Sequence, residues 1–278
     1  MSIINSSDLE NNKSFIYDVC IIGSGLCGQI VASKIKNKKI ILIDSRKVDF
    51  NKEVQDLNYL EMNGINFREN FTNRVRQLGG SANMWANQLM FLDRYEIEER
   101  KWLGENLSWP ISYDELKKNY YETISDIYGK NLNDPFKHIN DNNYFSIIEN
   151  EFFNEKNISF VNSMWPSKVE KFNLKSKFTQ KILKKKNLDF ISDFTATNFT
   201  INENIETLNE IMFQSDNKNI SIKANTFVLA CGAIENARIL LNNQSKYKIL
   251  ANNNIGKYIM EHINLSLGFL KSKKKLPL

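Results

Sequence analysis

A strand that runs directly into closely spaced glycines is the feature that most constrains how this chain can fold. Residues 15–22, FIYDVCII, are rich in β-branched and aromatic side chains, as in a buried strand. The stretch 23–28, GSGLCG, follows at once, and apolar residues at helical spacing continue as far as Ile35. The segment therefore predicts a strand, a tight turn and a helix in immediate succession.

The three glycines of this turn have separate physical roles. Gly23 permits the turn, Gly25 leaves room for a pyrophosphate to approach the backbone, and Gly28 allows the helix to pack closely on the strand. A second apolar strand, KIILID, ends in Asp44 about 20 residues further on, where a carboxylate can bind ribose hydroxyls. The pattern predicts a dinucleotide site on a Rossmann-type α/β domain. The alternative is a glycine-rich turn followed by an unrelated surface aspartate.

This first unit does not select among FAD, NAD and NADP, because all three use the same architecture. The charge of Asp44 disfavours a ligand with a 2′-phosphate, whereas Arg46 and Lys47 keep NADP open.

Two further segments concentrate glycine where a backbone could approach a ligand. Residues 73–88, NRVRQLGGSANMWANQ, form a loop with few large side chains around its paired glycines. Residues 225–241, NTFVLACGAIENARILL, read as a buried strand that breaks at Gly232 into a helix. Three such segments converging on one ligand fit a long, extended cofactor.

Composition excludes several classes of function. The apolar and charged fractions, 42% and 25%, are those of an ordinary globular chain, and no apolar run approaches the length of a membrane span. The first residues lack the features of a signal peptide, so we expect a cytoplasmic protein. The formal charge of +5 comes from dispersed lysines without the aromatic and basic pattern of a nucleic-acid module. Cys20, Cys27 and Cys231 lie in apolar runs, which predicts buried, reduced thiols rather than a disulfide framework or a metal site.

The middle of the chain differs from its flanks. Residues 113–128 and 176–186 have the periodicity of amphipathic helices, and residues 188–223 read as short strands in a meander. We expect a discontinuous FAD-binding domain over 13–110 and 188–262. Residues 111–187 and 263–278 would form part of a substrate-side domain.

Taken in order, the motifs resemble those of the GMC (glucose, methanol, choline) flavoprotein oxidoreductases. RQLGGSANMWANQ is similar to the second signature loop of that family, and SWPISYDELKKNYYETISDIYG, residues 108–129, to a segment of its sugar-oxidising branch. VLACGAIENARILL resembles the late strand and helix, and NIGKYIMEHINL a mid-sequence landmark with a histidine. The resemblance implies a three-layer α/β FAD-binding domain with a mostly parallel sheet and an inserted α+β substrate-side domain, incomplete in this chain.

The resemblance also implies a cofactor and its site. FAD would accept a hydride at flavin N5 from a CH–OH group of a small-molecule alcohol or sugar. Covalently flavinylated relatives attach FAD through a histidine of the second loop, where this chain has Met84, so we expect noncovalent FAD. The residues assigned to cofactor binding, by pattern or by resemblance, are Gly23, Ser24, Gly25, Leu26, Gly28, Asp44, Ser45, Arg76, Gly79, Gly80, Ser81, Asn83, Trp85, Cys231 and Gly232.

No general base is identified in the sequence. In the family the landmark histidine, here His262, is not the catalytic one, and His138 lies in a polar, loop-like stretch. The family's proton-accepting histidine comes from a later segment, which this chain, ending at Leu278, does not include. We therefore expect a truncated or split member, with a partner polypeptide as one source of the missing segment. A noncatalytic FAD-binding remnant and an NAD(P)-dependent reductase are the alternatives.

Overall fold

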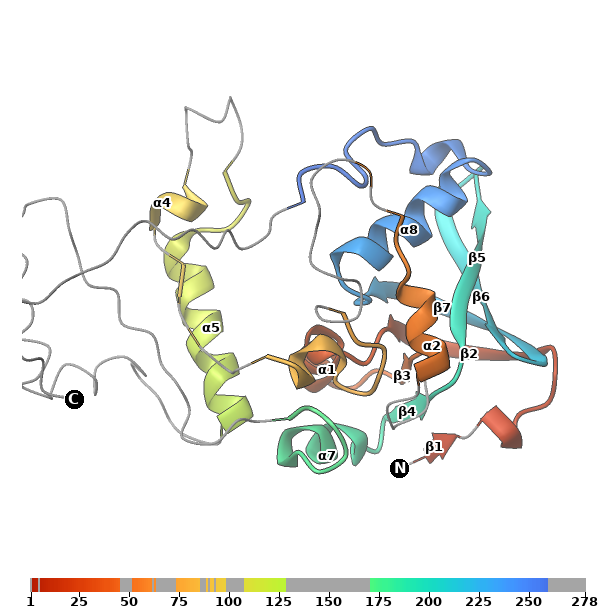
Figure 1. Cartoon of the computed structure of the whole chain (residues 1–278), viewed down its shortest axis with the longest axis horizontal. Helices are drawn as coiled ribbons and strands as arrows, with labels where there is room; N and C mark the ends of the chain where they lie inside the picture. Colours follow the sequence, from red (N-terminus) through yellow and green to blue (C-terminus); the bar gives the residue numbers. More distant parts are fainter. Residues whose placement is uncertain are drawn as a thin grey trace, which may run out of the picture.

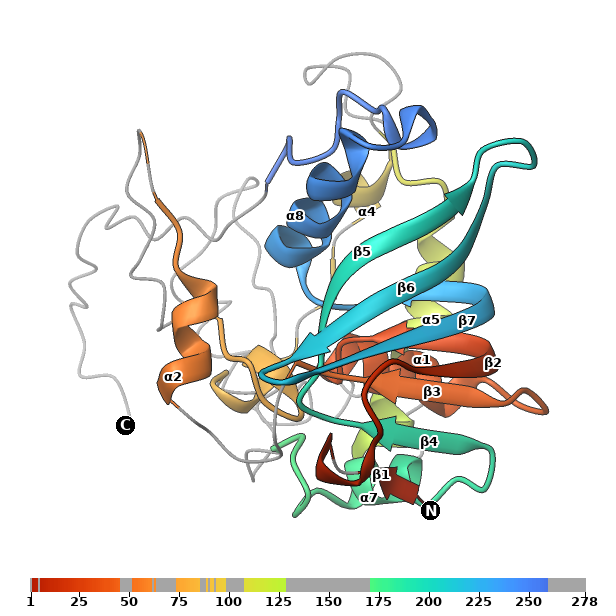
Figure 2. The same ribbon diagram turned by 90° about the vertical axis from the view of Figure 1, so that its right-hand side faces the viewer.

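A seven-stranded sheet forms the centre of the protein, with the strand order β1-β4-β3-β2-β7-β6-β5. Figures 1 and 2 show this sheet and the helices around it in two views of the structure, which is a computed structural model. The residues that it describes are 2–4, 6–45, 52–61, 63, 74–85, 89, 91–92, 94–98, 108–128 and 171–259.

The strands are β1 (Ser2–Ile4), β2 (Lys13–Ile22), β3 (Ile40–Ile43), β4 (Leu188–Ile191), β5 (Thr195–Asn202), β6 (Thr207–Ser215) and β7 (Lys218–Leu229). The α-helices are α1 (Leu26–Lys34), α2 (Lys52–Gln55), α4 (Arg94–Ile97), α5 (Tyr113–Tyr128), α7 (Lys177–Leu183) and α8 (Ala233–Gln244). The 3-10 helices are η1 (Ser6–Asp8), η2 (Asp56–Asn58), η3 (Gly80–Asn83) and η6 (Lys248–Leu250).

Five neighbouring strands, from β1 through β4, β3 and β2 to β7, run parallel to one another. Ile22 at the end of β2 is paired with Ile43 of β3 and with Leu229 of β7. The carboxyl ends of these three strands therefore meet at one edge of the sheet, which is where ligands bind in open α/β sheets.

The antiparallel part of the sheet is the expected meander, formed by β5, β6 and β7. Residues 188–191, which the sequence placed at the start of the meander, instead form β4 in the parallel part. Three of the four β4 residues are buried, and such a strand is suited to the interior of a parallel sheet covered on both faces.

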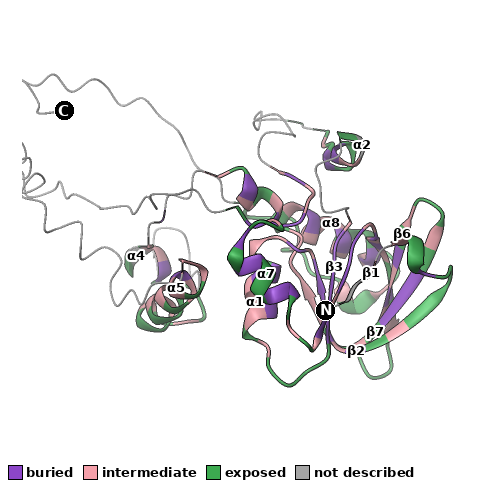
Figure 3. Cartoon of the chain, turned by 90° about the horizontal axis from the view of Figure 1, so that it is seen from below, coloured by how far each residue is buried: buried purple, intermediate pink, exposed green. Residues whose placement is uncertain are grey.

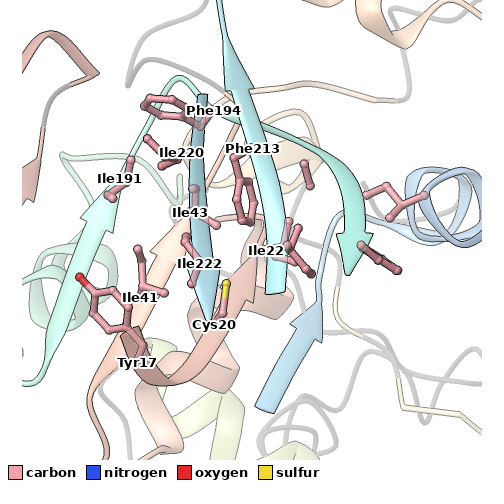
Figure 4. Close-up of a cluster of buried hydrophobic side chains, with 14 of the residues drawn as sticks. Tyr17, Cys20, Ile22, Ile41, Ile43, Ile191, Phe194, Phe213, Ile220 and Ile222 are labelled. Atoms are coloured by element: carbon pink, nitrogen blue, oxygen red, sulfur yellow. The ribbon is translucent and has the colours of Figure 1, made fainter. Parts of the chain in front are cut away.

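Alternating residues of the parallel strands build two separate cores. Ile40 and Leu42 of β3 pack with residues of α1 and α7, whereas Ile41 and Ile43 pack in a cluster that includes Ile239 of α8. Figure 3 shows α1 and α7 near one face of the sheet, and Figure 4 shows the second cluster. This arrangement confirms the predicted three-layer α/β fold, because the period-two pattern of a strand supplies one apolar side chain to each face in turn.

Two of the helices match the expected segments. α5 covers the predicted residues 113–128, and α7 begins after Ser176, whose hydroxyl oxygen accepts a hydrogen bond from the Thr179 N–H. α7 shares a core with α1, although the sequence assigned both α5 and α7 to the substrate side. The proposed division of the chain into two domains stays a prediction.

Candidate functional site

The glycines of the first loop differ in what a side chain would meet at each of them. Gly23 has φ +101°, and a Cβ there would lie 2.5 Å from the carbonyl oxygen of Ala230. A Cβ on Gly28 would lie 2.0 Å from the carbonyl oxygen of Gly23, so the close packing of α1 requires this glycine. At Gly25 the nearest atom would be Cα of Gly80, at 4.0 Å. Gly25 therefore leaves space that the described part of the chain does not use.

The second glycine loop lies directly against the first. Gly25 and Gly79 form an isolated parallel bridge, and the N–H of Gly79 donates to the carbonyl oxygen of Ser24 at 3.0 Å. Gly79 and Gly80 have φ values of +91° and +57°, in the left-handed region that favours glycine. The hydroxyl of Ser81 accepts a hydrogen bond from the Val75 N–H at 3.1 Å and so closes the loop.

The third glycine segment joins β7 to α8. Gly232 has φ +86° and ψ 160° immediately before α8, and a Cβ there would have no atom within 4 Å. Its neighbour Cys231 donates its thiol to the carbonyl oxygen of Ile22 at 3.2 Å, and burial raises the pKa of this thiol to about 12. The positive φ at position 232 therefore favours glycine there, and Gly232, like Gly25, leaves space beside the ends of the strands.

Asp44 holds the first loop in place from the end of β3. One carboxylate oxygen accepts hydrogen bonds from both the backbone N–H and the hydroxyl of Ser24, each at 2.6 Å. Asp44 is nearly buried but still contributes to the wall of a cavity. The carboxylate predicted to bind ribose thus also anchors the glycine loop.

A cavity of about 910 Å³ opens at the carboxyl ends of β2, β3 and β7. Its volume is at the upper end of the range for small-molecule and cofactor sites. The predicted residues that line it are Gly23, Gly25, Leu26, Asp44, Ser45, Arg76, Gly80, Ser81, Cys231 and Gly232. Ser24, Gly28, Gly79, Asn83 and Trp85 are not among the lining residues.

Asn83 and Trp85 belong to the second loop, but their side chains lie outside the cavity wall. The side-chain amide of Asn83 donates to the carbonyl oxygen of Leu78 and accepts from the N–H of Phe172, both at 2.8 Å. The Trp85 ring packs against the Phe172 ring with a centroid separation of 6.2 Å, and its buried indole N–H has no hydrogen-bond partner among the described residues. Both residues support the loop from outside the cavity, whereas Met84 between them is 58% exposed.

Four charged residues form a cluster at the cavity, of which only Arg76 was predicted from the sequence. Arg76 was predicted, and it forms an ion pair of 2.7 Å with Glu235 of α8. Glu235 also pairs with Arg238 at 2.8 Å and with Arg74 at 3.6 Å. Burial alone would raise the pKa of Glu235, but its two closer arginine partners outweigh burial and hold the pKa below its usual range. The i,i+3 spacing of Glu235 and Arg238 within a helix was a signal for part of this cluster.

Arg76 also joins three segments around the cavity. Its guanidinium donates to the hydroxyl of Ser45 at 3.2 Å and to the side-chain oxygen of Asn58 at 2.8 Å, in addition to pairing with Glu235. These contacts connect the end of β3, η2 and the first turn of α8.

The described cavity wall combines a helix N-terminus, exposed backbone at two glycines and three arginines. This combination suits an extended ligand that carries phosphate groups. His138 and His262 lie outside the described residues, and the described wall includes no histidine. Within the described ranges no group of three or more His, Cys, Asp or Glu side chains could hold a metal ion, and no helix could span a bilayer.

The chain resembles solved structures in its fold, but it matches no family model and no curated sequence. Pyridoxine 4-oxidase from Mesorbium loti matches with a TM-score of 0.51 and 13% identity over 81% of this chain. Formate oxidase of Aspergillus oryzae RIB40 matches with a TM-score of 0.46 and 13% identity over 84% of this chain.

The chain spans about half the length of these structures, 51% of pyridoxine 4-oxidase and 48% of formate oxidase. At 13% identity, the likeness to pyridoxine 4-oxidase bears on the fold alone. It agrees with the sheet and helices described above, and it shows that this chain has the same Rossmann-type α/β fold.

Proposed function

We propose that this chain is the FAD-binding part of an oxidoreductase that acts on a CH–OH group of an alcohol or sugar. The observation that carries the proposal is the space at Gly25, which lines the cavity beside the N-terminus of α1. No close atom of the described chain fills this space, so it is open to a ligand. The order of the glycine motifs, which resembles that of GMC oxidoreductases, and the fold shared with pyridoxine 4-oxidase support it.

The residues present fit a dinucleotide. Gly25 and the first turn of α1 would accept the pyrophosphate, because free backbone N–H groups and the positive end of the helix dipole favour anions. Asp44 and Ser45 lie where the adenosine ribose would bind at the end of β3. Met84 cannot form the histidyl link found in covalent flavoproteins, so the cofactor would be held noncovalently.

Bound FAD would supply the acceptor for a hydride, and the protein would bind and orient it. The reaction also requires an acceptor for the hydroxyl proton, and no described residue of the cavity wall is assigned that role. We propose that the proton acceptor comes from a further segment or a partner polypeptide.

The test compares substitutions at two glycines of the same loop. Gly25→Leu should leave the ligand-free chain folded, because φ is −62° and the atom nearest to the Cβ position is Cα of Gly80, at 4.0 Å, yet it should abolish FAD retention. Gly25→Ala should weaken retention less. Gly28→Ala should instead destabilise the chain itself, because its Cβ would meet the Gly23 carbonyl oxygen.

The measurements are flavin absorbance of the purified protein, chromatography of the nucleotide that it releases, and circular dichroism of each variant. Recovery of bound NADP without flavin would overturn the assignment of FAD, as would full flavin retention in the Gly25→Leu variant.

The noncovalent linkage has its own test. Acid precipitation of the loaded protein should leave all flavin in the supernatant, because no covalent bond would hold it to the denatured chain. Flavin that stays with the washed pellet would contradict this prediction.

A further inference from the structure

Among the described residues, the hydrogen bond that joins the two glycine loops directly is one between backbone atoms. The N–H of Gly79 donates to the carbonyl oxygen of Ser24, and a Cβ on Gly80 would lie 3.1 Å from Cα of Gly25. Such contacts between two short irregular segments do not by themselves fix the distance between the loops. The structure shows a third segment, far along the chain, that holds both.

That third segment is the backbone at Phe172. Its carbonyl oxygen accepts a hydrogen bond from the Gln29 side chain at 2.9 Å, and its N–H donates to the Asn83 side chain at 2.8 Å. The same carbonyl oxygen lies 2.3 Å from where a Cβ of Gly79 would be, so the absence of a side chain at Gly79 lets this backbone approach. Phe172 is fully buried.

Gln29 on α1 connects the first loop to this segment. Its side-chain N–H groups donate to the carbonyl oxygens of Ser24 and Phe172, at 3.0 and 2.9 Å. Its side-chain oxygen accepts from the Thr179 hydroxyl of α7 at 2.8 Å. Gln29 is fully buried, and its amide is satisfied at both donors and at the acceptor, as a buried polar network requires.

Asn83 connects the second loop to the same residue. Its amide N–H donates to the carbonyl oxygen of Leu78, immediately before the paired glycines, while its oxygen accepts from the Phe172 N–H. The ammonium of Lys171 adds a hydrogen bond of 2.5 Å to the carbonyl oxygen of Asn83. The two main-chain polar atoms of Phe172 are therefore bound by one amide from each loop.

We propose that Gln29 and Asn83 are positioning residues that, by binding the two polar backbone atoms of Phe172, set the separation of the glycine loops and thereby the affinity of the cavity for its ligand. Neither amide lines the cavity, so each acts through the loop that it holds. The ligand named in the first test, FAD, rests on the proposed function. The second test needs no ligand.

The first test uses three single variants, the double variant Gln29→Met with Asn83→Leu, and one control. Gln29→Met removes three hydrogen bonds at nearly constant volume, and Asn83→Leu removes two. Asn83→Asp keeps the acceptor for the Phe172 N–H and loses the donor to Leu78. Lys185→Met is the matched control, because Lys185 donates to the Ala32, Ser33 and Ile35 carbonyl oxygens at the far end of α1 and contacts neither loop.

FAD titration by flavin fluorescence should show affinity weakened about tenfold or more in Gln29→Met and in Asn83→Leu. Asn83→Asp should lose less than Asn83→Leu, because it keeps the contact with Phe172. The double variant should lose less than the product of the two single effects, because both act on one backbone segment. Lys185→Met should lower the midpoint of urea unfolding with no change in FAD affinity. Equal affinity in Lys185→Met and Gln29→Met at matched stability losses would overturn the proposal.

The second test measures hydrogen exchange in the ligand-free chain, and it stands even if FAD proves not to be the ligand. Gln29→Met should speed exchange of the Val75 N–H, which bonds to the Ser81 hydroxyl within the second loop and shares no hydrogen-bond partner with Gln29. Asn83→Leu should likewise speed exchange in residues 24–29. Exchange that changes only in the substituted loop would show that Phe172 does not couple the two, and the positioning role would be wrong.

Discussion

The three cysteines occupy different environments around the same strand ends. Cys20 is fully buried in β2, and burial raises the pKa of its thiol far above the usual range. Cys231 is also held in the protonated form, since burial and the nearby carboxylates of Asp44 and Glu235 raise the pKa of its thiol to about 12. The prediction that Cys27 is buried was wrong, because this residue, in the first turn of α1, faces the cavity and is exposed. The thiolate is the reactive form, so the exposure of Cys27 and the raised pKa values of the Cys20 and Cys231 thiols favour reaction at Cys27.

We expect a thiol reagent to label Cys27 alone in the folded chain at mildly alkaline pH. Bound FAD should slow this reaction, because Cys27 contributes to the cavity wall. Peptide mapping after alkylation identifies the labelled residue, and Cys27→Ser is the control. Labelling of Cys231 at the rate of Cys27 would contradict the prediction.

The charge cluster around Glu235 makes part of the stability depend on pH. The pKa of Glu235 is held below its unfolded value, so its contribution is present above about pH 4.5 and is lost as the pH falls through the folded pKa. Glu235→Gln should lower the free energy of unfolding by about 2 kcal/mol near neutral pH. The difference between the two proteins should shrink steadily below pH 4.5 in urea unfolding experiments. A difference that stays constant to pH 3 would show that ionised Glu235 does not supply this stability.

At the scale of elements, α8 covers the outer edge of the sheet. β5 is the strand at this edge. The side-chain oxygen of Asn243 in α8 accepts a hydrogen bond from the Phe199 N–H of β5 at 2.9 Å. The Tyr247 hydroxyl donates to the carbonyl oxygen of Phe199 at 3.0 Å. These side chains occupy polar backbone groups that would otherwise be open to pairing with another chain.

Asn243→Ala should therefore destabilise the protein by about 1–3 kcal/mol, because it leaves a buried backbone N–H without an acceptor. It should also increase self-association through the β5 edge. Urea unfolding and light scattering measure the two effects. Lys246→Ala, which removes an exposed contact with Asn198, is the matched control and should change neither. An Asn243→Ala protein as stable and as monodisperse as the control would refute this role.

At the scale of the whole molecule, the cavity is built by segments from both halves of the chain. The first and second glycine loops come from the N-terminal half, and residues 230–239 come from the other side of the sheet. A ligand bound there contacts all of them and should stabilise the folded state as a unit.

FAD at about 100 times its dissociation constant should add about 2.7 kcal/mol to the free energy of unfolding. For a chain of this size the melting temperature should rise by roughly 5–10 °C. Differential scanning fluorimetry with NADP at the same concentration and with the Gly25→Leu variant provides the controls. A shift of equal size with NADP, or in the variant, would contradict selective binding of FAD at this cavity.

Local features of the sequence were sufficient to predict the parallel core and much of the site. The strand at 15–22 and the helix at 113–128 follow from the side-chain period. The turn at Gly23 follows from the conformational freedom of glycine, and the close packing at Gly28 follows from its lack of a side chain. The cavity-lining positions Gly25, Asp44 and Gly232 follow because the carboxyl ends of parallel strands share one edge.

The tertiary structure decided what the side chains of the site do. Asn83, which was predicted to bind the cofactor, holds the Phe172 backbone and does not line the cavity, and Glu235 is the centre of an arginine cluster. The sequence contains no local signal for such pairings, because a buried amide or carboxylate takes its partners from whichever segments packing brings beside it. Phe172 lies in the same apolar cluster as residues of α1, α7 and the sheet, so its place beside the glycine loops depends on the packing of segments far apart in the sequence.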